Sequence, residues 1–160
     1  MAYANYNDYH SLYFGTDIPQ PEALGWLTRA SDMLDTFTFN RLHTAYPTEY
    51  DCKIRKAVCA MADELYKVEQ QRKAVAPQIG ADGSYHGSVS SITSGSQSIS
   101  YGSAGSGASV YATAAADEGA KRALVLNAAC LYLANVPDAN GVNLLYAGEG
   151  RYARRDNNGI

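Results

Sequence analysis

The sequence lacks the features that would mark an enzyme, a membrane protein or a nucleic-acid binder. No apolar run approaches the roughly 20 residues that span a bilayer. The N-terminus, MAYANYNDYH, has neither the basic nor the apolar region of a signal peptide. The formal net charge is −3, which argues against the basic surface typical of nucleic-acid binding. No nucleophile elbow, Walker loop or dinucleotide glycine signature is present, so we expect no enzymatic activity, no cofactor and no membrane partner.

Cysteine and histidine are few and scattered. An odd number of cysteines without metal-ligand spacing indicates reduced, mostly buried thiols at Cys52, Cys59 and Cys130. Because Cys52 and Cys59 are at helical spacing and can share a helix face, a metal or redox role is the alternative. The histidines fall in three separate segments, each without a ligand partner nearby in the sequence: His10, His43 and His86. We therefore expect no metal site.

Two parts of the composition stand out. Tyrosine occurs 13 times, against three phenylalanines and one tryptophan. Tyrosine is enriched at protein interfaces, although partly exposed core positions explain the count as well. The second feature is a Gly/Ser-rich block with almost no charge, residues 80–109. A segment of this kind is mobile unless something holds it, so we expect neighbouring chains to hold it.

The apolar residues are spaced as in helices over four segments: residues 5–14, about 22–37, about 49–73 and about 117–135. Tyrosines form the stripe of the first segment, and Gly15 is expected to end it. The stripe of the second includes Leu27 and Leu34, and that of the third includes Ile54 and Met61. The last segment is apolar almost all round, which predicts burial on several sides.

These elements predict a mainly α fold, a small helical bundle of three core helices plus a short N-terminal helix. The Gly/Ser-rich block is expected to hold a β-hairpin insertion, because SVSSIT and SISYG flank the turn residues SGSQ. The residues after Pro137 have no periodicity and are expected to form an extended C-terminal arm. The single domain thus has four parts: residues 1–79, 80–116, 117–136 and 137–160. Its core is thin for this length, so we expect assembly to contribute to stability.

The second predicted helix ends in an unusual stretch, RASDMLDTFTFNRL, residues 29–42. Its TFTF part is rich in β-branched and aromatic residues, which are poor helix formers. We therefore expect these residues to pack a structural corner formed by Phe37, Phe39, Asn40 and Arg41. The polar side chains of this stretch are expected to bond to the carbonyls at the helix end or to the next loop.

This stretch resembles the pattern Ala-Ser-x-x-Ile/Leu-Asp-x-x-Thr-Phe-Asn-Arg-Ile/Leu of head–tail connector (adaptor) proteins of long-tailed bacteriophages. Other segments are similar to that family in the same order along the chain. They are YNDYHSLYFGTDIP near the N-terminus, KIRKAVCAMADELYKVE in the third predicted helix, SISYG in the block and LLYAGE near the C-terminus. The Gly/Ser-rich block and the tail are longer here than in compact members of the family.

The resemblance implies a structural virion protein in the neck between head and tail, assembled in the host cytoplasm. Such proteins form a homo-oligomeric ring of about twelve copies under the portal. The ring extends the channel for genomic DNA, which passes without sequence-specific binding. It also docks the next neck protein, a stopper or tail-completion protein. The alternatives are that this chain is itself such a stopper or tail-completion protein, or a small helical nucleic-acid-binding regulator.

Two docking surfaces follow from this interpretation. The C-terminal arm is expected to clasp the portal, with strand addition by NLLYAG as one mode, through Leu144, Leu145, Tyr146, Arg151, Tyr152, Arg154 and Arg155. A solvated terminus is the alternative for its arginines. The hairpin is expected to contact a neighbouring subunit or the next ring through Val89, Ile92, Ile99 and Tyr101.

Overall fold

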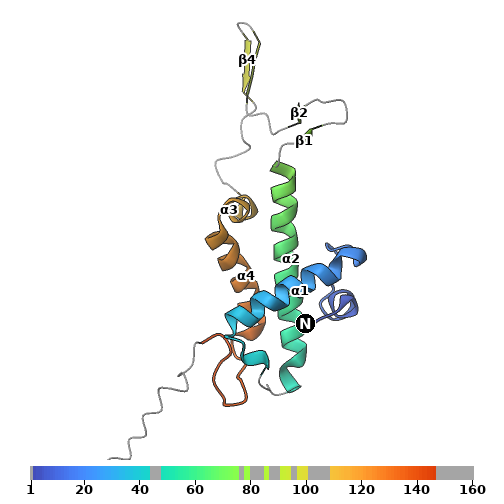
Figure 1. The fold of residues 1–160 in the computed structure, drawn as a ribbon, viewed down its shortest axis with the longest axis vertical. Helices are drawn as coiled ribbons and strands as arrows, with labels where there is room; N and C mark the ends of the chain where they lie inside the picture. Colours follow the sequence, from blue (N-terminus) through green and yellow to red (C-terminus); the bar gives the residue numbers. More distant parts are fainter. Residues whose placement is uncertain are drawn as a thin grey trace, which may run out of the picture. The chain divides into compact units, whose positions relative to one another are not determined.

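The computed structural model describes residues 2–43, 48–75, 78–79, 85–86, 91–94, 97–100 and 109–146, with side chains in the ranges 2–43, 48–74 and 109–146. The fold is mainly α-helical, as predicted, and is a small helical bundle (Figure 1). The helices are η1 (Asp8–Leu12, a π-helix), α1 (Gln20–Phe37), η2 (Arg41–His43), η3 (Thr48–Tyr50), α2 (Asp51–Val75), α3 (Val110–Ala116) and α4 (Glu118–Leu133). The chain divides into two compact units: unit 1 holds residues 1–66 and 124–160, and unit 2 holds residues 67–123.

α1 and α2 form where their apolar stripes predict them. α1 begins with Pro21 in its first turn, where the missing N–H of proline is harmless. Its stripe is buried, and so is that of α2, with Leu27, Leu34, Ile54 and Met61 all fully inaccessible. α1 crosses in front of α2 in Figure 1, and one core cluster contains residues of both helices. The predicted helices at 22–37 and 49–73 are thus confirmed within about two residues.

The N-terminal segment packs onto the core of unit 1, to which it belongs, through its tyrosines. Tyr9 is 1% exposed and belongs to the core, and Tyr3, Tyr6 and Tyr13 pack around the core at half-buried positions. The helix ends at Leu12, before Gly15. Gly15 serves instead as a close approach, because a Cβ at this position would overlap the Tyr9 ring.

The end of α2, α3 and the first turn of α4 belong to unit 2. α3 lies within residues 80–116, for which the sequence predicts a loop with a hairpin, although its VYATAAA sequence is alanine-rich and favours a helix. Asp117 separates the two helices and caps α4, since its Oδ2 accepts the backbone N–H of Ala120 at 2.8 Å. α4 ends at Leu133, two residues before its predicted end.

Two short antiparallel strand pairs lie within residues 78–100. β1 (Gln78–Ile79) pairs with β2 (Tyr85–His86), and β3 (Ser91–Ser94) pairs with β4 (Gln97–Ser100), with Ile92 opposite Ile99. The turn residues 95–96 and the flanks of these pairs lie outside the described residues. The predicted insertion and its contacts therefore stay predictions.

Candidate functional site

The end of α1 reverses the chain sharply, as the corner prediction requires. Thr38 is fully buried, and both its backbone N–H and its Oγ1 donate to the carbonyl of Leu34 at 2.9 Å. Phe39 and Asn40 then adopt left-handed backbone angles, with φ of 55° and 57°. Asparagine tolerates this region, whereas a bulky phenylalanine rarely adopts it. This conformation turns the next residue, Arg41, back under the end of the helix.

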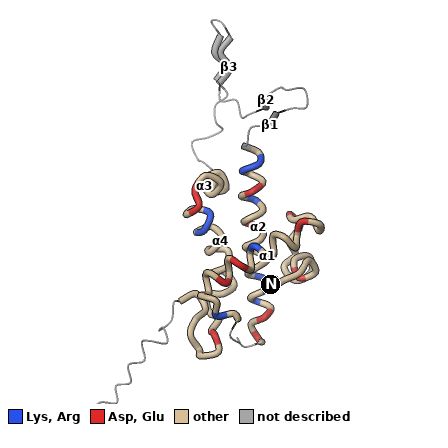
Figure 2. Tube along the Cα trace, viewed as in Figure 1, with Lys and Arg blue, Asp and Glu red and all other residues tan. Residues whose placement is uncertain are grey.

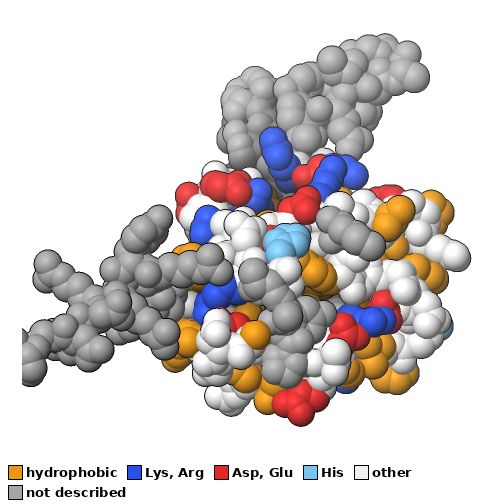
Figure 3. Space-filling model, turned by 60° about the horizontal axis from the view of Figure 1, so that its bottom comes forward, with side chains coloured by type: hydrophobic (Ala, Val, Ile, Leu, Met, Phe, Trp, Pro, Cys, Tyr) orange, Lys and Arg blue, Asp and Glu red, His pale blue; other side chains and the backbone are white. Residues whose placement is uncertain are grey.

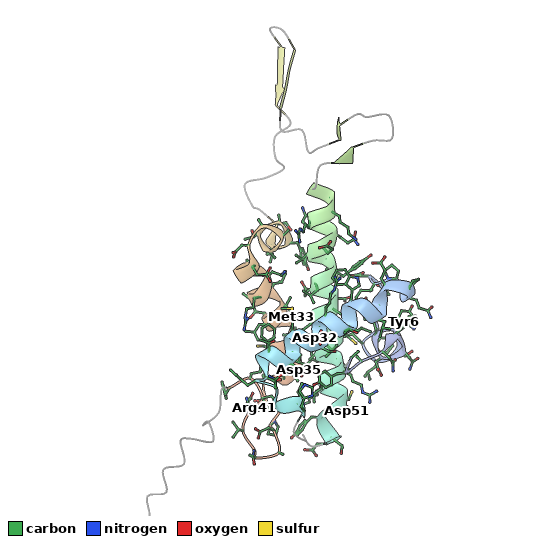
Figure 4. All side chains as sticks on the ribbon, in the orientation of Figure 1. Tyr6, Asp32, Met33, Asp35, Arg41 and Asp51 are labelled. Atoms are coloured by element: carbon green, nitrogen blue, oxygen red, sulfur yellow. The ribbon has the colours of Figure 1, made fainter. Side chains whose placement is uncertain are left out.

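Arg41 holds two distant parts of the chain together (Figure 4). Its Nη1 donates to Oδ2 of Asp138 at 3.2 Å, and its Nη2 donates to the carbonyls of Asn143 at 3.0 Å and Leu144 at 2.6 Å. Nη2 also bonds to the Tyr146 carbonyl, and Nε donates to the Thr38 carbonyl at 3.2 Å. We call this arrangement the Arg41 clamp. The fork of N–H donors on a guanidinium suits several acceptors at once.

The clamped segment is a compact loop built on Asp138. Its Oδ1 accepts the N–H groups of Asn140 at 2.8 Å and Val142 at 3.0 Å, and its own N–H donates to the Val142 carbonyl at 2.7 Å. Gly141 supplies the left-handed φ of 79° that this turn needs. Burial alone would raise the pKa of Asp138, but these N–H groups and Arg41 outweigh it and lower that pKa. The carboxylate therefore stays charged beside the guanidinium.

The loop after α4 returns to the core of its own chain, so the expected extended arm is corrected for residues 137–146. Leu144 and Val136 are both fully buried, and the Leu144 N–H donates to the Val136 carbonyl at 2.9 Å. The Asn143 side chain also bonds to the carbonyl of Ala134. The sequence held a signal for this fold-back in its turn residues PDANG, which separate two apolar positions.

The residues predicted to dock on the portal therefore differ in how far they are exposed. Leu144 packs in the core and cannot face a partner, and Leu145 is half-buried against the core. Tyr146 is 69% exposed and remains available. The other predicted docking residues lie outside the described residues: Arg151, Tyr152, Arg154 and Arg155. Of the predicted hairpin contacts, Val89 and Tyr101 lie outside as well, and nothing is described of the Ile92 and Ile99 side chains.

The predicted corner residues divide into buried and exposed members. Phe37 is buried, while Phe39 is 53% exposed and lies near the Arg41 guanidinium, 5.8 Å from ring centroid to Cζ. The Asn40 side chain is exposed. The corner is predicted to bond to the end of the helix or to the next loop, but Arg41 also bonds to the C-terminal loop, about 100 residues away in sequence. That long-range pairing has no local sequence signal.

A second buried polar cluster fixes the N-terminal segment. The Tyr9 hydroxyl donates to Oδ1 of Asp63 at 2.6 Å and accepts the N–H groups of Asp17 at 3.0 Å and Ile18 at 3.1 Å. Burial first, and then the Asp63 carboxylate, raise the pKa of Tyr9, so its proton stays in place as a donor. Tyr3 likewise donates to a carboxylate, Oδ1 of Asp35, at 2.5 Å. These tyrosines pack inward, which favours the core alternative for the tyrosine excess in this segment.

The described parts of the chain do not bring together the side chains that a metal site or a redox site would need. No cluster of three or more potential metal ligands forms among those residues. Cys59 is buried, and burial together with Asp8 and Asp63 raises the pKa of its thiol to about 12. Cys52 is exposed and Cys130 is half-buried, so only one of the three thiols is fully buried as expected.

The charge pattern of α2 and the length and apolar character of the described helices bear on whether nucleic acid or a membrane is a partner. Acidic and basic residues are mixed along α2 instead of forming a stripe of one sign (Figure 2). Among the described helices, none combines the length and the apolar character that crossing a bilayer requires. Comparison of the chain with protein-family models, with curated proteins and with solved structures found no match.

Proposed function

We propose that this protein is a non-enzymatic head–tail adaptor in the neck of a tailed bacteriophage virion. In this proposal about twelve copies form a ring under the portal. The ring extends the channel through which genomic DNA passes and gives a stopper or tail-completion protein a surface on which to dock.

The observation that carries the proposal is the Arg41 clamp. The stretch at residues 29–42, which resembles the adaptor pattern most specifically, contains Arg41 and also Thr38, whose carbonyl accepts a hydrogen bond from Arg41 Nε. The clamp fixes residues 138–146 and therefore sets the point from which residues 147–160 continue. A protein whose C-terminal segment must meet a partner benefits from a rigid exit point, because less entropy is lost on binding.

A stopper or tail-completion protein is the second candidate, since it would use a similar small helical bundle. The resemblance at residues 29–42 favours the adaptor over it. A nucleic-acid-binding regulator is the third candidate. The net charge of −3 and the mixed charges along α2 weigh against it, because phosphate binding requires a basic surface.

The proposal is tested by binding to the portal ring of the same phage. Full-length protein and a variant lacking residues 147–160 are mixed with purified portal and separated by sedimentation. We expect the full-length protein to sediment with the portal and the truncated protein to remain free. The deletion starts after Tyr146 so that Leu144 and the Arg41 clamp are retained. Undiminished binding of the truncated protein would refute the arm assignment, and no binding of the full-length protein would refute the adaptor function.

A further inference from the structure

The short helix η2 makes contacts toward both ends of the chain. Its middle residue, Leu42, is buried in the core and anchors the turn. On one side Arg41 reaches the loop after α4 through the Arg41 clamp. On the other side His43 Nε2 lies 3.2 Å from Oδ2 of Asp35 in α1, whose side chain is only 13% exposed. Asp35 and Arg41 both lie close to the end of α1 (Figure 4).

Asp35 also holds the N-terminal segment. Its Oδ1 accepts the Tyr3 hydroxyl at 2.5 Å, while its Oδ2 faces His43. The ring centroids of Tyr3 and His43 are 6.3 Å apart. The Tyr3 N–H donates to Oγ of Ser31 at 3.0 Å, and Ser31 is fully buried. Tyr3, Asp35 and His43 therefore join the N-terminal segment, α1 and η2, and we call these three residues the N-terminal contact group.

The backbone of the corner links the N-terminal contact group to the Arg41 clamp. The Asn40 N–H donates to the Asp35 carbonyl at 2.8 Å. The Thr38 carbonyl accepts both the backbone N–H of Arg41 at 3.0 Å and its Nε at 3.2 Å. Between these bonds, Phe39 and Asn40 have left-handed φ angles. A strained backbone persists only where its surroundings determine it fully, so this corner depends on the contacts on both of its sides.

We infer that η2 couples the N-terminal segment to the loop after α4. The N-terminal contact group stabilises the Arg41 clamp, and the clamp stabilises the contact group to the same extent, because a coupling free energy is reciprocal. The coupling is a property of the single chain and does not require the adaptor function. One consequence rests on that proposed function: a partner bound to the N-terminal segment would alter how firmly residues 138–146 hold the start of residues 147–160.

Coupling within the chain is favoured over a ligand site on the face drawn in Figure 3. Acidic and basic side chains lie there in small mixed groups, and apolar side chains reach the surface at scattered places. Scattered apolar residues are normal on a protein surface and indicate no partner. The contacts of η2, by contrast, are partly buried and join segments that are far apart in the sequence.

The test is a set of double-mutant cycles on the full-length protein. Tyr3→Phe removes the hydroxyl that Asp35 accepts and keeps the ring. Asp138→Asn removes the charge that faces Arg41 and keeps an Oδ1 acceptor for the turn. Urea denaturation gives the equilibrium constant of unfolding for each single variant and for the double variant. Contacts that share no partner have additive effects, whereas coupled contacts do not.

A second variant and a matched control complete the design. His43→Ala removes the other neighbour of the Asp35 carboxylate at a position that is itself 58% exposed, so the chain should still fold. Tyr9→Phe is the control, because it also removes a hydroxyl bonded to a carboxylate. Tyr9 bonds to α2 and to the backbone of residues 17 and 18 instead of the corner.

We expect Asp138→Asn to change the unfolding equilibrium constant at least about threefold less in the Tyr3→Phe and His43→Ala backgrounds than in the wild type. In the Tyr9→Phe background its effect should be unchanged. Additive effects in either of the first two cycles, or an equal departure from additivity with Tyr9→Phe, would overturn the inference.

Hydrogen exchange locates the change within the fold. The amides of Val142 and Leu144 bond within the loop after α4, and the amide of Met61 in the core of α2 reports global unfolding. We expect exchange in the loop, relative to Met61, to rise at least about threefold in Tyr3→Phe and to stay constant in Tyr9→Phe. Unchanged relative exchange in Tyr3→Phe would also overturn the coupling. The portal sedimentation assay with the wild type does not depend on this result, so the adaptor function is tested separately.

Discussion

Replacing Arg41 by alanine removes a side chain that ties the corner after α1 to the loop after α4. The change deletes the ion pair with Asp138, which is 7% exposed, and the bonds to the carbonyls of Asn143, Leu144 and Tyr146. A hydrogen bond involving a charged group contributes about 1.5–3 kcal/mol, but several bonds that share one guanidinium are not additive. Arg41 is also 16% exposed, so water screens part of the effect.

We therefore expect Arg41→Ala to lower the free energy of unfolding by about 2–4 kcal/mol, including the cost of a poorly paired Asp138 carboxylate. For a chain of this length that corresponds to a fall of about 5–15 °C in Tm. Urea and thermal denaturation measure the loss. Hydrogen exchange at the amides of Val142 and Leu144, which bond within the loop, locates it.

Arg41→Lys is expected to lose less than Arg41→Ala, because lysine keeps a charge near Asp138 but lacks the planar fork that reaches several carbonyls. Arg29→Ala is the control, since Arg29 is exposed and lies 4.7 Å from the centroid of the Trp26 ring. Its loss should not exceed about 1 kcal/mol. A loss below about 0.5 kcal/mol for Arg41→Ala, with unchanged exchange in the loop, would refute the clamp as a stabilising element.

Three further changes test the core and the charges. Tyr9→Phe should cost about 1–3 kcal/mol in urea denaturation, because Asp63 loses a buried donor; stability equal to wild type would contradict the network. Leu144→Ala should cost about 2–5 kcal/mol by the same assay, and a surface-like loss under 0.5 kcal/mol would show that the loop is not docked. Because the folded-state pKa of Asp138 is lowered, the stabilisation from its charge is present above about pH 4 and is lost as the pH falls through the folded value. The stability difference between wild type and Asp138→Asn should therefore shrink below about pH 4, and a difference that is constant with pH would contradict this role.

The sequence predicted α1 and α2 well but not the burial of Leu144, for identifiable physical reasons. Apolar spacing determines α1 and α2, since one face of each must be buried, and their stripes are buried as expected. The same reasoning failed for Leu144, because its burial depends on a fold-back that Arg41 stabilises from the far end of the sequence. A short stretch of sequence around Leu144 contains no information on its pairing with Arg41. α3 was missed because the Gly/Ser-rich neighbourhood outweighed the helix propensity of its alanines.

The position of the corner at the end of α1 was predicted, but the hydrogen-bond partners of Arg41 were not. Poor helix formers correctly marked the end of α1, and Thr38 bonds to the last turn as expected. The left-handed conformation of Phe39 could not be anticipated, since asparagine or glycine normally occupies such a position. The partners of Arg41 emerged only from the tertiary structure.

The most direct test of the adaptor proposal is electron microscopy of the protein mixed with the portal ring of its phage, with copies counted per particle. The proposal predicts a ring of about twelve copies stacked on the portal, with its channel continuous with that of the portal. Particles in which the portal stays bare, while the protein binds DNA or tail components instead, would contradict the proposal and favour one of the two other candidates.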